Sequence, residues 1–275
     1  MTFSLLVPTD FSQPADHALA YADALAGAID AQLVLLHVRR DSPFDPERLS
    51  GRADEESQQV TDLALASLMR SLTVPATAET GHGRVATAVV EALARHQPAL
   101  AVLGHRDTEA LPDEVVATVP LDILRTAPQP LLVVPVGAPV IVPRRLLLAV
   151  DAEQFSLGEH MGLVCHFLTA LGAPLTVLHV APEPSAIADA AALEAVERTG
   201  LALDLPLLSF RPLTHAEPAE GILQVLAEGN FDAVALIVRP RSFLGSLFHR
   251  SVTAAVLLHS PVPVLVLPAT AESVQ

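Results

Sequence analysis

The stretch LLVPTD at residues 5–10 decides the fold, because the chain holds a second version of it, LLLAVD, at residues 146–151. Each is an apolar run that ends in an aspartate and lacks the polar alternation of a half-exposed strand, which predicts a buried parallel strand. Each is followed by a helical stretch and then by another apolar strand ending in His-Val. That histidine comes 27 positions after the first aspartate (37 − 10) and 28 after the second (179 − 151). One strand–helix–strand plan is therefore used twice.

The repeat predicts two domains, residues 1–137 and 144–275, joined by a proline-containing linker at 136–144. Strands that alternate with helices favour a Rossmann-like α/β fold, here five parallel strands per half with helices on both faces. Each half closes on a similar segment, PQPLLVVP at 128–135 and PVPVLVLP at 261–268. We expect the last strands, residues 131–134 and 264–267, to pack together, since their edges would otherwise be exposed.

Composition excludes several classes of function. The formal net charge of −15 argues against binding to nucleic acid or anionic membranes, which depends on clustered Lys and Arg. A single cysteine, Cys165, rules out an internal disulfide framework and fits a reducing cytoplasm. No apolar run approaches the roughly 18 residues of a membrane span. With 51% hydrophobic residues and no Trp, the cores should be aliphatic.

Local signals predict the other elements. Ser12 and Pro14 mark the start of the first helix, as N-cap and first-turn residue. A strand is expected at 74–79, followed by a turn at 80–83. In the second half we expect a helix over 156–171 and a strand at 205–210.

The ordered fragments resemble a tandem universal stress protein. They are LLVPTDFS (5–12), LVLLHV (33–38), ALAVLGH (99–105) and PQPLLVVP (128–135), then LLLAVD (146–151), LTVLHVAP (175–182), DAVALIV (232–238) and PVPVLVLP (261–268). The resemblance implies two domains of the adenine nucleotide alpha hydrolase-like type. In the nucleotide-binding branch of that family the fourth strand ends in Gly, two residues, Gly, nine residues and Gly-Ser/Thr. Such glycines let backbone amides approach phosphates.

Half one departs from this glycine pattern. Gly104 holds the first position, but Asp107 and Ala117 stand at the second and third, and Thr118 keeps the hydroxyl. A carboxylate where a phosphate would lie repels it. The loop from Gly104 to Asp107 instead resembles the branch typified by universal stress protein A, which does not bind ATP.

Half two departs further. Its three glycine positions fall on Ile237, Pro240 and Arg250, and Ser251 keeps the hydroxyl. Proline removes an amide donor. Arginines around this loop could grip an anion in a bidentate fork, or could be solvated and pair with acidic neighbours.

The resemblance assigns Asp10 and Asp151 to the adenine side of a nucleotide and the backbone of Val38 and Val180 to the base. Either aspartate could equally cap the turn or helix that follows it. The candidate residues of half one are Pro8, Thr9, Asp10, Val38, Gly104, His105, Arg106, Asp107, Ala117 and Thr118. Those of half two are Asp151, Val180, Arg239, Arg241, Arg250 and Ser251.

We therefore expect a non-catalytic, cytoplasmic stress-response protein with degenerate nucleotide pockets. The alternative is a sensor that binds ATP or AMP in half one. A weak nucleotide hydrolase is a third class, but no general base or nucleophile motif is evident. The histidines lack the spacing of metal ligands, so neither a metal nor another cofactor is expected. Whether chains pair further into a homodimer is left open.

Overall fold

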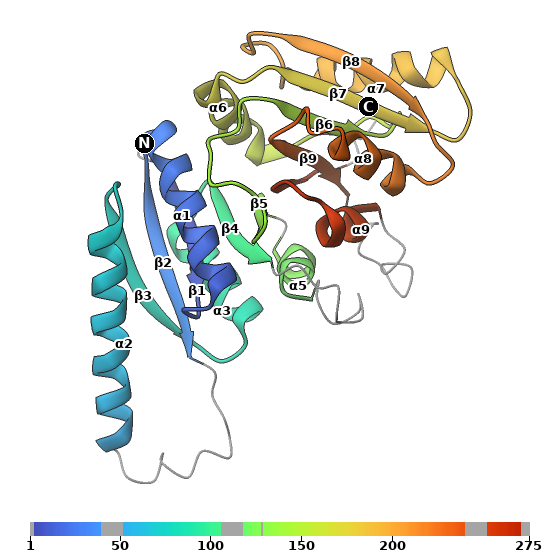
Figure 1. The fold of residues 1–275 in the computed structure, drawn as a ribbon. Helices are drawn as coiled ribbons and strands as arrows, with labels where there is room; N and C mark the ends of the chain where they lie inside the picture. Colours follow the sequence, from blue (N-terminus) through green and yellow to red (C-terminus); the bar gives the residue numbers. More distant parts are fainter. Residues whose placement is uncertain (1–2, 40–51, 106–117, 128, 240–251, 271–275) are drawn as a thin grey trace.

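The computed structural model describes residues 3–39, 52–105, 118–127, 129–239 and 252–270. Within them ten strands form one sheet in the order β3-β2-β1-β4-β5-β10-β9-β6-β7-β8 (Figure 1). Strands β1–β5 belong to half one and β6–β10 to half two. The fold is thus α/β, with two Rossmann-like halves of five strands each.

Half one alternates strands and helices as predicted. Its elements are β1 (Phe3–Thr9), α1 (Gln13–Ala28), β2 (Ala31–Arg39), α2 (Arg52–Ser71), β3 (Ala76–His82), α3 (Val85–His96), β4 (Leu100–His105), α5 (Thr118–Thr126) and β5 (Leu131–Pro135). Ser12 is the N-cap residue of α1, with Pro14 in the first turn. Both positions agree with the sequence prediction.

Half two repeats the order. Its elements are β6 (Leu146–Val150), the short 3-10 helix η2 (Gly158–His160), α6 (Met161–Leu171), β7 (Leu175–Ala181), α7 (Ala186–Thr199), β8 (Leu208–Thr214), α8 (Pro218–Ala227), β9 (Ala233–Val238), α9 (Val252–His259) and β10 (Val264–Pro268).

The two halves join through their last strands. All pairings within each half are parallel, whereas β5 and β10 pair antiparallel, with Val264 opposite Val133 and Val266 opposite Leu131. This pairing confirms the expected contact between the last strands. Because each strand covers the exposed edge of the other, the sheet continues through the seam.

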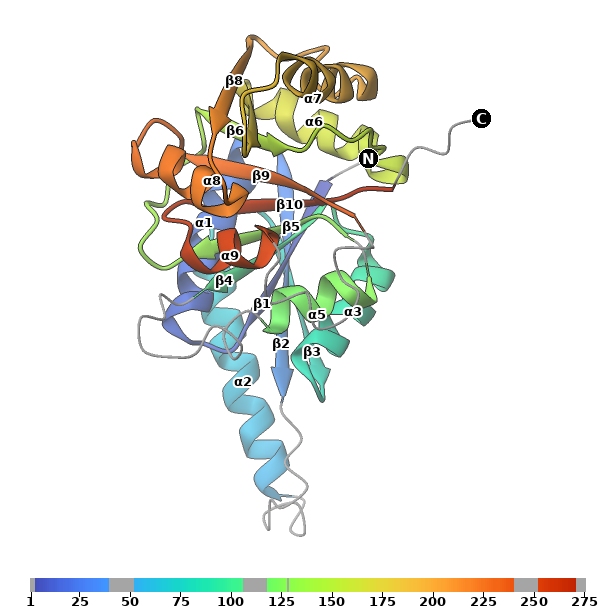
Figure 2. The same ribbon diagram turned by 90° about the vertical axis from the view of Figure 1, so that its right-hand side faces the viewer.

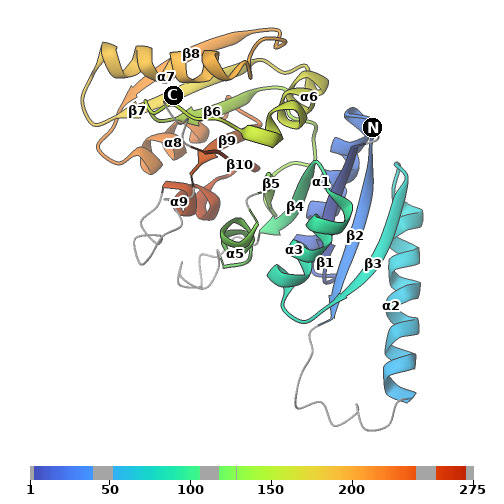
Figure 3. The same ribbon diagram turned by 180° about the vertical axis from the view of Figure 1, so that it is seen from behind.

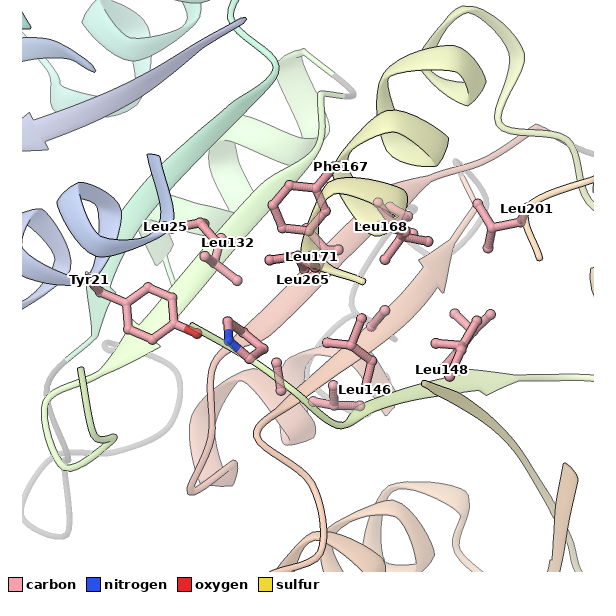
Figure 4. A pocket seen from close by; sticks show the side chains of 16 residues that line it. Tyr21, Leu25, Leu132, Leu146, Leu148, Phe167, Leu168, Leu171, Leu201 and Leu265 are labelled. Atoms are coloured by element: carbon pink, nitrogen blue, oxygen red, sulfur yellow. The ribbon is translucent and has the colours of Figure 1, made fainter. Parts of the chain in front are cut away.

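Helices cover both faces of the sheet (Figures 1 and 3). One buried cluster joins the sheet to α1, α2, α6 and α7, and the other joins it to α3, α5, α8 and α9. Both clusters span the two halves. At the seam, Tyr21 and Leu25 of α1 face Phe167 and Leu168 of α6 across a cavity of about 20 Å³ (Figure 4). That volume holds about one water molecule, so the halves are closely packed.

Three local predictions were wrong. Strand β3 continues to His82, so the turn lies at Gly83, whose φ of 90° suits glycine. Strand β8 covers Leu208–Thr214 rather than 205–210. The expected helix over 156–171 begins only at Met161, because Ser156 forms an antiparallel bridge with Thr270. That bridge joins distant parts of the chain, so local sequence does not reveal it.

Within the part of the chain that the structure describes, no helix combines the length and the apolar character needed to cross a membrane.

Candidate functional site

A cavity of about 180 Å³ in half one is lined by residues at the ends of β1, β2 and β4. Figure 2 shows these strands in the sheet of half one. Strand β1 has β2 on one side and β4 on the other, so the strand order reverses here, which is the usual place for a ligand in such sheets. The lining residues are Pro8, Thr9, Asp10, Ser12, Pro14, Ala15, Val38, Val85, Leu103, Gly104 and Val119. Five of them were predicted as site residues: Pro8, Thr9, Asp10, Val38 and Gly104.

A tight turn shapes the polar side of this cavity. The Ser12 amide donates to Oδ1 of Asp10 at 3.1 Å, and the Phe11 amide donates to Oγ1 of Thr9 at 3.2 Å. Phe11 has a φ of 57°, which a non-glycine residue adopts only when its surroundings demand it. Asp10 therefore does form the turn, and its side chain is still exposed beside the cavity.

His37 holds the end of β2 against this turn. Its Nδ1 lies 2.9 Å from the carbonyl oxygen of Thr9, and because a carbonyl only accepts, Nδ1 donates. The imidazole ring also contacts the Phe11 ring, with centroids 4.7 Å apart. This side chain is engaged in positioning the turn.

Gly104 brings helix α1 to the cavity. A Cβ at this position would lie 2.0 Å from the carbonyl oxygen of Pro14 and 3.1 Å from the amide nitrogen of Ala15. Only glycine allows such an approach of the first turn of α1 to β4. Gly104 is thus required for helix packing, whatever binds nearby.

The chemistry of the lining suits binding. Val38, Val85, Leu103 and Val119 form an apolar wall, whereas Asp10, Ser12 and Thr9 supply oxygen atoms. A carboxylate favours ligands that present N–H or O–H donors over ligands that present an anion. Among the residues described, no group of three His, Cys, Asp or Glu is placed to hold a metal ion.

The remaining candidates of half one are not all placed. His105 ends β4 and is buried, and Thr118 begins α5. Arg106, Asp107 and Ala117 lie outside the described residues, as does the Thr118 side chain. The sequence prediction missed Ser12, Pro14, Ala15, Val85, Leu103 and Val119 as lining residues. In the sequence, Gly104 was the feature that could have indicated a helix packed closely against β4.

Half two has a different arrangement at the equivalent edge. Asp151 forms the same kind of turn, accepting from the Glu153 amide at 3.1 Å. Arg239, directly after β9, donates from Nη1 to Oδ2 of Asp151 at 2.6 Å and from Nη2 to Oδ1 at 3.0 Å. Its side chain is 6% exposed, against 53% for Asp151.

The other candidates of half two are not drawn into this pair. Val180 packs toward α8, where a Cβ on Gly221 would lie 2.7 Å from its Cγ1. Arg241, Arg250 and Ser251 lie outside the described residues. Of the predicted second-half site, the structure thus brings together Asp151 and Arg239.

Comparisons with known proteins agree with this architecture. The family model described as "Universal stress protein family" matches residues 1–135 and 211–268. A universal stress protein from Archaeoglobus fulgidus DSM 4304 superimposes with a TM-score of 0.73 at 18% identity, over 96% of this chain and 98% of the other. A putative universal stress protein from Pseudomonas aeruginosa UCBPP-PA14 gives 0.59 at 18% identity, over 98% and 94%.

A protein of unknown function from Pseudomonas aeruginosa PAO1 gives a TM-score of 0.60 at 19% identity, over 97% of this chain and 92% of the other. No curated protein sequence matched significantly. At these identities the structural likenesses concern the fold, while the family model matches more than half of the chain and includes residues of both halves. The chain belongs to the universal stress protein family.

Proposed function

We propose that this chain is a non-catalytic universal stress protein of the cytoplasm that binds one small ligand of the adenosine class in half one. The observation that carries the proposal is the cavity of about 180 Å³ beside Asp10. Pockets for drug-sized ligands usually have about 300–1,000 Å³. The cavity is therefore suited to a nucleobase with part of its ribose, with any phosphate lying outside.

The lining supports this ligand class. Val38, Val85 and Val119 offer an apolar surface to a flat ring, and Asp10 offers an acceptor to an amino or hydroxyl group. Phosphate groups gain little support from the sequence, since Asp107 and Ala117 replace two glycines of the family pattern. Adenosine and AMP should therefore bind about as well as ATP.

The proposal that the protein is non-catalytic rests on the same lining. Hydrolysis needs a general base near the bond that breaks. The described polar side chains of the lining are a turn-forming aspartate and two hydroxyls. The nearby His37 is not a lining residue, and its Nδ1 donates to the Thr9 carbonyl.

Isothermal titration with adenosine, AMP and ATP, with and without magnesium, tests the proposal. We expect adenosine and AMP to bind at one site per chain, with ATP no more than about tenfold tighter. Absence of heat at millimolar adenosine and AMP would contradict ligand binding in half one. Release of phosphate from ATP, followed over hours with a heat-inactivated control, would contradict the non-catalytic assignment.

A further inference from the structure

Arg239 lies in half two where half one has its cavity. Asp151 follows β6 as Asp10 follows β1, and β9 flanks β6 as β4 flanks β1. The position in half two that corresponds to the half-one cavity is therefore next to Asp151, at the end of β9. Arg239 is the first residue after β9, and its side chain lies over that end of the sheet.

The guanidinium of Arg239 donates hydrogen bonds to oxygen atoms of Asp151 and Glu153. Its two terminal nitrogens donate to the two oxygens of Asp151 at 2.6 and 3.0 Å, and Nη2 also donates to the Glu153 carbonyl at 2.9 Å. Two parallel bonds to a carboxylate are the strongest and most directional arrangement that a guanidinium makes. With 6% of its side chain exposed, the guanidinium lies beneath Asp151 rather than in solvent.

The backbone around Arg239 is built differently from half one. Helix α1 begins at Gln13, three positions after Asp10, whereas α6 begins at Met161, ten positions after Asp151. Ile237 stands where Gly104 stands in half one: Ile237 pairs with Leu267 on β10, and Gly104 pairs with Val134 on β5. A side chain at 237 is incompatible with a helix as close as α1.

The segment that replaces the early helix supports the guanidinium. The Glu153 carbonyl accepts from Nη2 of Arg239, and the Gln154 carbonyl lies 3.4 Å from the same nitrogen. The Glu153 carboxylate lies 4.0 Å from Nε. Three features of half two therefore belong together: Ile237 in place of a glycine, the late start of α6, and the burial of the Arg239 side chain.

We propose that Arg239 is a built-in occupant of the half-two cleft, which takes the place of a small-molecule ligand at Asp151 and keeps that cleft closed. The closure rests on the contacts of Arg239 alone. The consequence that a chain binds one ligand rather than two rests on the proposed function of half one.

The test removes the guanidinium by mutation and then supplies a free guanidinium compound in solution. In Arg239→Ala we expect the melting temperature to fall by several degrees, and millimolar methylguanidinium chloride to restore part of the loss relative to equal sodium chloride. The matched control is Arg211→Ala, because Arg211 makes a similar two-point contact with Glu228, at 2.8 and 2.6 Å, on the exposed surface. The control should lose at most about one degree and gain nothing from methylguanidinium.

Equal melting temperatures in the two variants, or an equal response to methylguanidinium, would overturn the proposal. If Arg239→Ala does not fold, Asp151→Asn replaces it, compared with Glu228→Gln. This change keeps the size of the side chain and removes the charge that Arg239 meets. A fall in melting temperature no larger than that of Glu228→Gln would equally overturn the proposal.

The two proposals fail separately. Restoration by methylguanidinium without any binding of AMP to the wild type would refute the ligand site of half one and retain the closure of half two. Binding of AMP without restoration would refute the closure alone. Two AMP molecules per wild-type chain would show that the half-two cleft is open and would overturn the closure directly.

Discussion

Gly104 and Pro14 approach so closely that a Cβ on Gly104 would lie 2.0 Å from the Pro14 carbonyl oxygen. The contact joins β4 to the first turn of α1, and both residues line the half-one cavity. The packing of α1 and the shape of the half-one cavity therefore both depend on the absence of a side chain at position 104.

Gly104→Ala should destabilise the protein by roughly 2–4 kcal/mol, because backbone atoms of a helix must move to admit the methyl group. Chemical unfolding followed by circular dichroism measures the loss. The matched control is Gly162→Ala in α6, where a Cβ meets nothing within 4 Å. It should be neutral or stabilise by up to about 1 kcal/mol. Similar stabilities of the two variants would contradict the close approach.

Asp10→Ala should weaken binding of adenosine or AMP by roughly 1–3 kcal/mol, the usual cost of losing a hydrogen bond to a charged group. Titration calorimetry measures it, provided that circular dichroism shows the fold unchanged. Asp62→Ala, on the exposed face of α2, removes the same charge away from the cavity and should leave affinity unchanged. Equal affinity for wild type and Asp10→Ala would remove Asp10 from the ligand site.

Tyr21→Phe should protect the protein against alkaline unfolding. Burial, reinforced by the charge of Asp232, raises the pKa of the Tyr21 hydroxyl far above its ordinary value of about 10. The unfolded chain then ionises first, so stability is complete below about pH 10 and falls as the pH rises. The free energy of unfolding between about pH 9.5 and 11.5 should decline less steeply in Tyr21→Phe. Parallel curves would show that Tyr21 ionises equally easily in both states.

Asp232→Asn should lose about 1 kcal/mol at neutral pH, and the difference should vanish in acid. Burial raises the pKa of Asp232, but hydrogen bonds from the Arg145 side chain and the Arg144 backbone outweigh it, so the net pKa is lowered. The stability is therefore present above the unfolded pKa of about 3.9 and is lost as the pH falls through the folded value. Urea unfolding at pH 7 and pH 3 measures both differences. A deficit that persists undiminished at pH 3 would contradict this account.

Much of the fold could be predicted from the sequence, because local residue patterns indicate it. The apolar runs ending at Asp10 and Asp151 marked two buried strands at the same edge of a parallel sheet. The similar proline-flanked segments at the end of each half indicated the pairing of β5 with β10, which the structure has. The true bounds of β3 and β8 were missed, since strands at the sheet's outer edges carry little apolar signal.

The sequence by itself determined the tandem α/β plan, the family and the place of two aspartates at strand ends. Only the tertiary structure decided that a cavity lies beside Asp10 and that Arg239 pairs with Asp151. The physical reason is distance along the chain: Asp151 and Arg239 are 88 positions apart, and Gly104 meets a helix that starts at Gln13. Hydrophobic periodicity gives information only about residues that are close in sequence. The contacts of Asp151 with Arg239 and of Gly104 with α1 join residues that are far apart in sequence, so periodicity does not predict them.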